Sequence, residues 1–258
     1  MKAVILAGGR GSRLLEETAV RPKPMVEIGG RPILWHIMRI YAHHGIEDFI
    51  VCAGYKGYLI KEYFANLALH RSDVRFDLGR NSIEYLGHNE PLNWRVTVVD
   101  TGENTMTGGR LRRVAAHLEA DEPFCMTYGD GLSDVDVAGS IALHKRQGVL
   151  ATMTIVRPPA RFGSVQLSGD RIAAFREKLP ASEGFINGGF FVLSKQAIDL
   201  IAGDDTVWEQ EPLERLASGG QLAAFRHDGF WQPMDTMRDR LLLEELWAGA
   251  APPWKVWA

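Results

Sequence analysis

The sequence predicts an α/β protein built on a mostly parallel sheet. Short apolar runs rich in β-branched residues alternate with segments of helical periodicity, as residues 49–54 and 58–69 illustrate. This alternation is typical of parallel strands joined by right-handed crossover helices. Turns rich in glycine or containing aspartate follow several of the apolar runs. Because open α/β sheets bind ligands at the carboxyl ends of their strands, these turns form the candidate site.

The first strand and the turn after it carry the most informative pattern. Residues 3–7 are an apolar run expected as a buried strand, and the turn that follows contains Gly8, Gly9 and Gly11. Glycines let a backbone turn tightly and aim its N–H groups at one point, where they bind phosphate. Arg13 adds a planar cation, and prolines on both sides of Lys23 restrict its position. The sequence therefore predicts a polyphosphate cradle, with a simple tight turn as the alternative.

Two other phosphate-binding motifs do not fit this turn. A P-loop requires Gly-Lys followed by Ser or Thr, and the chain lacks that tripeptide. The dinucleotide fingerprint requires a third glycine where Leu14 stands. It also requires an acid about 20 residues further on, where residues 28–31 read Ile-Gly-Gly-Arg. These differences argue against a P-loop NTPase and weaken the hypothesis of a Rossmann oxidoreductase.

Composition excludes several classes of partner. The 258 residues carry a formal net charge of −3, which gives no overall attraction to nucleic acid or to acidic membranes. No run approaches the roughly 20 apolar residues of a membrane span, and the N-terminus leads directly into the first strand without a signal peptide. Cys52 and Cys125 lie in expected strands, as buried free thiols. We expect a cytoplasmic protein with no nucleic-acid or membrane partner.

The first half of the chain alternates strands and helices apart from one interruption. Pro32 suits the first turn of a helix. Residues 71–94 contain several turn-forming residues and are expected to be loops and short strands. The loop 101–110 is rich in glycine and hydroxyls, so it is a second candidate for the ligand edge, or an ordinary connection. The elements expected here are strands 3–7, 49–54 and 96–100 and helices 31–41, 58–69 and 111–118.

The second half changes character after Arg157. Residues 163–175 are expected to form a hairpin. Glycines inside the next strand, 184–193, indicate close approach by a ligand or another backbone. The aromatic tail 252–257 is expected to dock on the body of the protein or on a partner subunit. The remaining elements expected are strands 124–128, 151–156 and 222–225, helices 137–147 and 237–247, with Thr236 as a cap of the latter, and a helix beginning at residue 211.

Two aspartates lie in turns of small residues beside strands. Asp130 stands between two glycines, and Asp235 lies in a turn punctuated by glycine and proline. Aspartate is common in turns because of its local hydrogen bonds, which is the alternative explanation. With a phosphate loop nearby, however, carboxylates for Mg²⁺ are favoured, because Mg²⁺ in nucleotide sites takes one or two carboxylates plus phosphates.

These motifs together resemble the sugar-1-phosphate nucleotidyltransferases. The resemblance extends from Leu6 to Thr236. It implies a Rossmann-like nucleotidyltransferase core, a mostly parallel mixed sheet between helices, with inserted β elements for the sugar. It implies one domain, 1–258, with a nucleotide-binding part (1–156), a sugar-binding part (157–236) and a C-terminal helix and tail (237–258). The segments that carry it are LAGGRGSRL, PKPM, TGGRL, TYGDG, EKLP, GFINGGFF, EQEPLE and WQPMDT.

The resemblance also implies residue roles. Ser12 stands where the family often has threonine, and the family's EKP is stretched to Glu177-Lys178-Leu179-Pro180. The implied catalytic residues are Arg13, Lys23, Asp130 and Asp235, of which the two aspartates hold Mg²⁺. The implied nucleotide-binding residues are Leu6, Ala7, Gly8, Gly9, Arg10, Gly11, Ser12, Arg13, Lys23, Thr105, Arg110 and Gly129. The implied sugar-phosphate-binding residues are Glu177, Lys178, Asn187 and Gly188.

Within the family, MTGGRL, TYGDG, INGGFF and WQPMD together are similar to the cytidylyl branch. That branch implies transfer of a cytidylyl group from CTP to glucose 1-phosphate for deoxysugar and polysaccharide synthesis, and a homo-oligomer, a trimer or hexamer. One alternative is the same reaction with UTP, dTTP or another sugar 1-phosphate. A second is a non-catalytic nucleotide-sensing module. Such a module would be expected to lack Lys23, Asp130 or Asp235, and all three are present.

Overall fold

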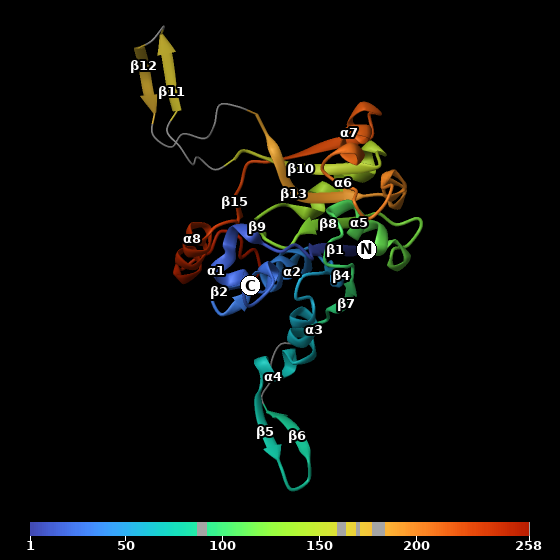
Figure 1. Cartoon of the computed structure of the whole chain (residues 1–258), viewed down its shortest axis with the longest axis vertical. Coiled ribbons are helices and arrows are strands. Elements are labelled where there is room, and N and C mark those ends of the chain that lie inside the picture. Colours follow the sequence, from blue (N-terminus) through green and yellow to red (C-terminus); the bar gives the residue numbers. More distant parts are fainter. Residues whose placement is uncertain (87–91, 159–163, 169–170, 177–183, 258) are drawn as a thin grey trace.

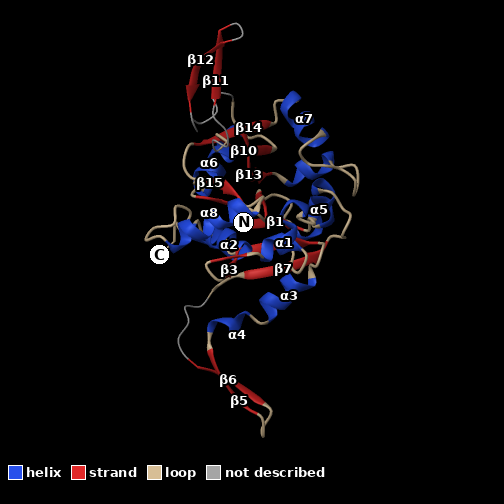
Figure 2. Ribbon diagram, turned by 60° about the vertical axis from the view of Figure 1, so that its left-hand side comes forward, coloured by secondary structure: helices blue, strands red, loops and turns tan. Residues whose placement is uncertain are grey.

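A computed structural model shows one seven-stranded sheet with helices on both faces (Figures 1 and 2). It describes residues 1–86, 92–158, 164–168, 171–176 and 184–257. One strand, β13, runs antiparallel to its two neighbours, and the other pairs in the sheet are parallel. The predicted mostly parallel mixed sheet is therefore confirmed. In spatial order the strands are β14 (Leu222–His227), β10 (Ala151–Val156), β13 (Ile186–Leu193), β8 (Phe124–Tyr128), β1 (Lys2–Ala7), β4 (Asp48–Ala53) and β7 (Arg95–Asp100).

Apolar side chains of the strands alternate between two cores, one on each face of the sheet. In β1, Ala3 and Ile5 belong to one core, whereas Val4 and Leu6 belong to the other. A strand buried on both sides needs a continuous apolar run, which is why this segment was recognisable in the sequence. The first core packs on α2 (Ile33–His43), α3 (Tyr58–Ala65), α6 (Val137–Gln147) and α8 (Met237–Ala248), and the second on α5 (Thr107–Arg113), η4 (Lys195–Leu200) and α7 (Glu211–Ser218).

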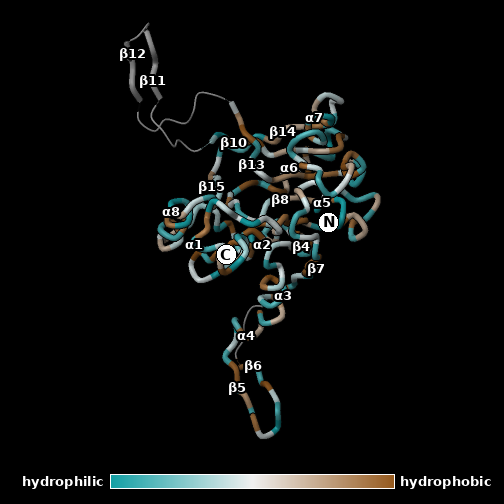
Figure 3. Tube along the Cα trace, viewed as in Figure 1, coloured by the Kyte–Doolittle hydropathy of each residue, from teal (hydrophilic) through white to brown (hydrophobic). Residues whose placement is uncertain are grey.

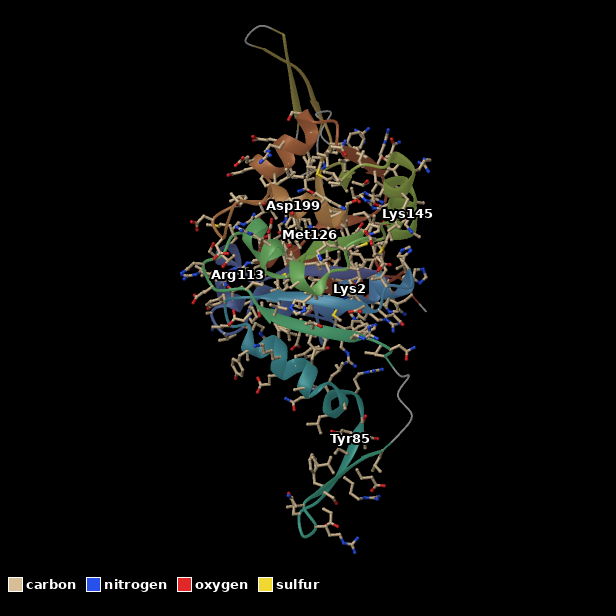
Figure 4. All side chains as sticks on the ribbon, turned by 90° about the vertical axis from the view of Figure 1, so that its right-hand side faces the viewer. Lys2, Tyr85, Arg113, Met126, Lys145 and Asp199 are labelled. Carbon is tan, nitrogen blue, oxygen red and sulfur yellow. The ribbon has the colours of Figure 1, made fainter. Side chains whose placement is uncertain are left out.

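Four small two-stranded ladders lie outside the main sheet in the described part of the chain. One fulfils the expectation of short strands within 71–94, and Figure 4 shows its labelled Tyr85 projecting away from the body. Another forms the predicted hairpin after Arg157. Figure 3 shows that apolar segments concentrate in the central strands. The ladders are β2 (Glu27–Ile28) with β3 (Arg31–Pro32), β5 (Asp73–Asp77) with β6 (Ser82–Leu86), β9 (Gly131–Ser133) with β15 (Trp231–Pro233), and β11 (Ser164–Ser168) with β12 (Arg171–Arg176).

Several helices begin or end at other residues than the sequence predicted. The helix expected at 111–118 begins earlier as α5 and ends in a 3-10 turn, η3 (Ala115–His117). The helix expected at 58–69 is broken at Asn66 into α3 and a short α4 (Leu67–Arg71). Thr236 caps α8 as predicted, in a reciprocal capping box with Asp239. No described helix is long and apolar enough to cross a bilayer. The remaining short helices are η1 (Ser12–Leu14), α1 (Leu15–Thr18) and η2 (Lys23–Met25).

The aromatic tail docks on the body of its own chain. Trp254 is fully buried and stacks on Trp247 of α8, with ring centroids 6.0 Å apart. Its indole N–H donates to Nδ1 of His36 at 3.3 Å. The packing accounts for the tail within one chain, so the tail no longer supports the expected homo-oligomer.

His36 is buried in α2 and is held neutral by its two partners. Because a tryptophan only donates, Nδ1 of His36 must accept, and Nε2–H then donates to the carbonyl of Ile28 at 2.9 Å. Burial lowers the pKa of His36 to about 4. Protonation at Nδ1 would place a hydrogen against the Trp254 N–H, so the docked tail requires the neutral ring.

This histidine predicts a loss of stability in mild acid. The unfolded ring binds a proton near its ordinary pKa, whereas the folded ring does so only near pH 4. The folded state is therefore destabilised as pH falls from about 6.5 toward 4, by about 3 kcal/mol in full. Urea unfolding between pH 7 and 4.5 should show a steeper decline for the native chain than for His36→Gln, which keeps a donor and an acceptor but does not titrate. Parallel curves would contradict this role.

Candidate active site

A cavity of about 550 Å³ opens at the carboxyl ends of the parallel strands. The turn after β1 forms one wall, and the ends of β8 and β15 form another. Because β13 is antiparallel, its beginning lies at the same edge and contributes Asn187 and Gly188. The loop before α5 supplies Thr105 and Met106 on the remaining side. The edge predicted for the ligand is therefore the edge where a cavity exists.

The glycine-rich turn presents backbone to the cavity. Gly11 adopts a left-handed conformation, with φ of 63°. A side chain there would also lie 2.8 Å from the Thr18 side chain, so both the backbone conformation and the close packing require glycine. The Thr18 hydroxyl donates to the carbonyl of Gly11 at 3.1 Å. Within the described part of the chain, the N–H groups of Gly9 and Gly11 donate to no carbonyl. These free donors suit an anion.

The Lys23 ammonium lies between the two predicted metal carboxylates. Its Nζ donates to Asp130 at 2.6 Å and to Asp235 at 2.8 Å. The β9–β15 ladder brings these aspartates together by pairing Gly131 with Pro233, each one or two residues from its aspartate. The N–H of Met234 also donates to the carbonyl of Asp130 at 2.8 Å. Residues distant in the sequence thus converge on one cation.

Ion pairs set the charge state of this cluster. In the sequence neither aspartate has a basic neighbour, but in the fold both pair with Lys23, and Arg13 Nη1 lies 2.9 Å from Asp235. Burial of Lys23 lowers the pKa of its ammonium, but the Asp130 and Asp235 carboxylates outweigh burial, so the pKa is raised. Lys23 is therefore charged at neutral pH. The Arg13 side chain is 71% exposed, which leaves most of its guanidinium free to meet a ligand.

The aspartate pair fits a divalent cation of the Mg²⁺ type. Two carboxylates already converge on one positive charge, Lys23 Nζ. No group of three or more histidine, cysteine or acidic side chains suitable for a metal occurs among the described residues. Mg²⁺ suits such a limited set, because it takes one or two carboxylates and completes its shell with water and substrate phosphates.

Arg110 holds together the turns that follow three strands. It is 4% exposed, and its two terminal nitrogens lie within hydrogen-bond distance of four backbone carbonyls and one hydroxyl. Desolvation lowers the pKa of Arg110. The guanidinium also fills the space that a side chain at Gly8 would need, at 2.0 Å. The acceptors are the carbonyls of Gly8, Ala53, Gly102 and Glu103 and the hydroxyl of Thr101.

The two glycines beginning α5 serve packing. The N–H of Met106 donates to the carbonyl of Asp204 at 2.8 Å, and that of Gly108 to Thr206 at 3.0 Å. A side chain at Gly108 would lie 2.7 Å from the Thr206 carbonyl oxygen, and one at Gly109 would lie 2.5 Å from that of Asp204. Backbone carbonyls therefore cover the first turn of the helix. Of the two interpretations of loop 101–110, the ordinary connection explains its glycines, while Thr105 still lines the cavity.

Most predicted site residues line this cavity. Arg10 does not: its guanidinium pairs with Glu103 at 3.0 Å on the surface. Glu177 and Lys178 lie outside the described residues. Sequence reasoning did not select Tyr128 or Trp231, although both stand inside quoted motifs. The predicted residues in the lining are Leu6, Ala7, Gly8, Gly9, Gly11, Ser12, Arg13, Lys23, Thr105, Arg110, Gly129, Asp130, Asn187, Gly188 and Asp235.

Comparison with known proteins decides the family. The model of the family described as Nucleotidyl transferase matches residues 2–231. The chain belongs to this family. It is 57% identical over 257 residues to a glucose-1-phosphate cytidylyltransferase of Salmonella typhi, covering 100% of each chain, and 42% identical to a probable one of Bacillus subtilis, also over 100% of each.

The fold agrees with that assignment. The crystal structure of HddC from Yersinia pseudotuberculosis superposes with a TM-score of 0.70 at 25% identity. The superposition covers 95% of this chain and 99% of that one. The α/β core expected from the sequence is thus shared with a solved structure along nearly the whole chain.

The contacts of Arg110 predict that lysine cannot replace it. Arg110→Lys removes the planar fork and leaves buried carbonyls unpaired, so we expect a loss of about 1–3 kcal/mol in unfolding free energy. Arg113→Lys is the matched control, because Arg113 on the same helix pairs with Asp204 in an exposed ion pair. Guanidinium unfolding of both variants measures the difference. Equal stabilities of the two variants would show that Arg110 does not fasten the turns.

Proposed function

We propose that the protein transfers a cytidylyl group from CTP to glucose 1-phosphate, giving CDP-glucose and pyrophosphate. The observation that carries this proposal is the 57% identity, over the full length of both chains, with an enzyme of that name. The cavity supports it, because a phosphate-suited turn, two cations and a carboxylate pair meet at one edge.

The residues suit an in-line displacement at the α-phosphorus of CTP. An oxygen of the sugar phosphate attacks, the bond from the α-phosphorus to the bridging oxygen breaks, and pyrophosphate takes the electron pair. The attacking phosphate has a second pKa of about 6, so it is mostly dianionic at neutral pH and requires no general base. The main barrier is repulsion between anions, which Lys23, Arg13 and the free N–H groups of the turn would lower.

Asp130 and Asp235 would hold Mg²⁺ in this reaction. The metal, when bound, would neutralise phosphate charge and help to fix the α-phosphate geometry. Lys23, which now pairs with both carboxylates, would move its charge toward the phosphates. Thr105 and the loop that Arg110 fixes line the cavity and are proposed to read the base.

A substrate panel tests this proposal. With Mg²⁺ and glucose 1-phosphate, pyrophosphate release should be fastest with CTP. We expect kcat/KM for CTP to exceed that for UTP or dTTP about 100-fold, because a wrong base leaves buried polar groups unpaired. Equal turnover with UTP would refute the cytidylyl assignment, and no turnover with any combination of nucleotide and sugar phosphate would favour the nucleotide-sensing module.

Removing one charge from the carboxylate pair should stop turnover without unfolding the protein. Asp130→Asn and Asp235→Asn keep the side-chain shape, and Lys23 retains one carboxylate partner in each. We expect kcat to fall roughly 1,000-fold at saturating Mg²⁺. Asp228→Asn is the control, because Asp228 is exposed and pairs with Arg226. Near-normal kcat in either site variant would mean that its aspartate only stabilises a turn.

A further inference from the structure

Glu209 stands behind the cavity wall and contacts it through two hydroxyls. It lies in the turn before α7, inside the EQEPLE segment, and does not itself line the cavity. One carboxylate oxygen accepts from the Thr107 hydroxyl at 2.6 Å, and the other accepts from the hydroxyl of Tyr128. Thr107 and Tyr128 both line the cavity. Both oxygens of the carboxylate are thus committed to wall residues.

The carboxylate fixes the direction of the Tyr128 hydroxyl. An ionised carboxylate only accepts hydrogen bonds, so the Tyr128 hydroxyl must donate its single proton to Glu209. The Thr107 hydroxyl does not occupy the carboxylate oxygen that Tyr128 contacts, because it donates to the other oxygen of Glu209. The Thr107 oxygen in turn accepts from the N–H of Trp208 at 2.9 Å. Burial, and then Glu209, raise the pKa of Tyr128, so the phenol keeps its proton. Its oxygen therefore has only lone pairs to offer the cavity.

The neighbouring amide is oriented in the same way. The N–H of Gly189 donates to Oδ1 of Asn187 at 2.8 Å, which turns Nδ2 toward Tyr128 at a long 3.5 Å. Gly189 lets the ring lie close, because a side chain there would meet the ring of Tyr128 at 2.7 Å. Trp231 holds this part of β13 through a hydrogen bond of 2.7 Å from its indole N–H to the carbonyl of Gly188. The ring and the amide thus form a rigid polar corner.

We infer that Glu209 is a positioning residue that makes Tyr128 a pure hydrogen-bond acceptor for one hydroxyl of the sugar phosphate. The inference rests on the proposed function. A hydroxyl at the matching position of the sugar donates to Tyr128. A fluorine or a carbonyl oxygen at that position has no hydrogen to donate, so its lone pairs face the lone pairs of the Tyr128 oxygen and the two atoms repel. Glu209 thereby sets which sugars are accepted without touching any of them.

The test uses deoxyfluoro analogues of glucose 1-phosphate substituted at carbon 2, 3, 4 or 6. Fluorine nearly matches the hydroxyl in size but cannot donate. For the native enzyme we expect one position at which kcat/KM falls about tenfold or more relative to glucose 1-phosphate, beyond any general effect of fluorine on the other positions. In Glu209→Gln the amide can donate to Tyr128, which frees the phenol proton for the cavity, so the penalty at that position should shrink severalfold.

Two further variants separate this role from a structural one. Tyr128→Phe removes the acceptor and should abolish the same penalty, and it remains informative if Glu209→Gln does not fold. Glu211→Gln is the matched control, because Glu211 lies two residues away, is exposed and pairs with Arg215 at 3.7 Å. Its fluorine profile should equal that of the native chain.

The outcomes are distinguishable from failure of the proposed function. Turnover of CTP with glucose 1-phosphate by the native enzyme tests that function alone. If another sugar 1-phosphate is the substrate, its own fluorinated series is used. An unchanged penalty in Tyr128→Phe, or an unchanged penalty in folded Glu209→Gln, would overturn the inference, as would a native profile with no position-specific penalty.

Discussion

The contact between Lys23 and two carboxylates is the interaction on which the site depends. Three segments meet there: the η2 turn after the phosphate-suited loop, the end of β8 and the end of β15. None of the three groups is fully exposed, so removal of the cation would leave two partly buried like charges facing each other. The attraction therefore fastens the turn after β15 to the turns that follow β1 and β8.

Much of the fold was predictable because its strands are buried on both faces. Continuous apolar runs identified β1 and β4. The capping residue Thr236 indicated where α8 begins. Residues 107–110 belong to the loop predicted from its glycines and hydroxyls, yet α5 begins at Thr107. Only the fold reveals the reason: carbonyls of the 204–206 segment approach too closely for any side chain.

The site was predictable where its chemistry is local. The glycine turn and the two turn aspartates were found because strand ends collect at one edge of a sheet. The β9–β15 ladder was not found, because three-residue strands carry no periodicity. Tyr128 was predicted only as a residue of a buried strand. Its role at the site could not be predicted, because its partner Glu209 lies 81 positions away in the sequence. Arg110 lines the cavity, and its predicted contact with the nucleotide stays a prediction. No sequence spacing indicates the five protein acceptors that surround its guanidinium.

Charge balance explains why this cluster suits a metal-assisted reaction. Arg13 and Lys23 carry two positive charges, and Asp130 and Asp235 carry two negative ones, so the cluster is neutral before any ligand enters. Two phosphate-bearing substrates, as proposed above, would bring several negative charges into the same cavity, and a neutral cluster cannot offset them. A divalent cation held by the two carboxylates would supply the missing positive charge and would leave Lys23 and Arg13 available to the phosphates. The ion pairs thus hold both cations at the site before any ligand enters.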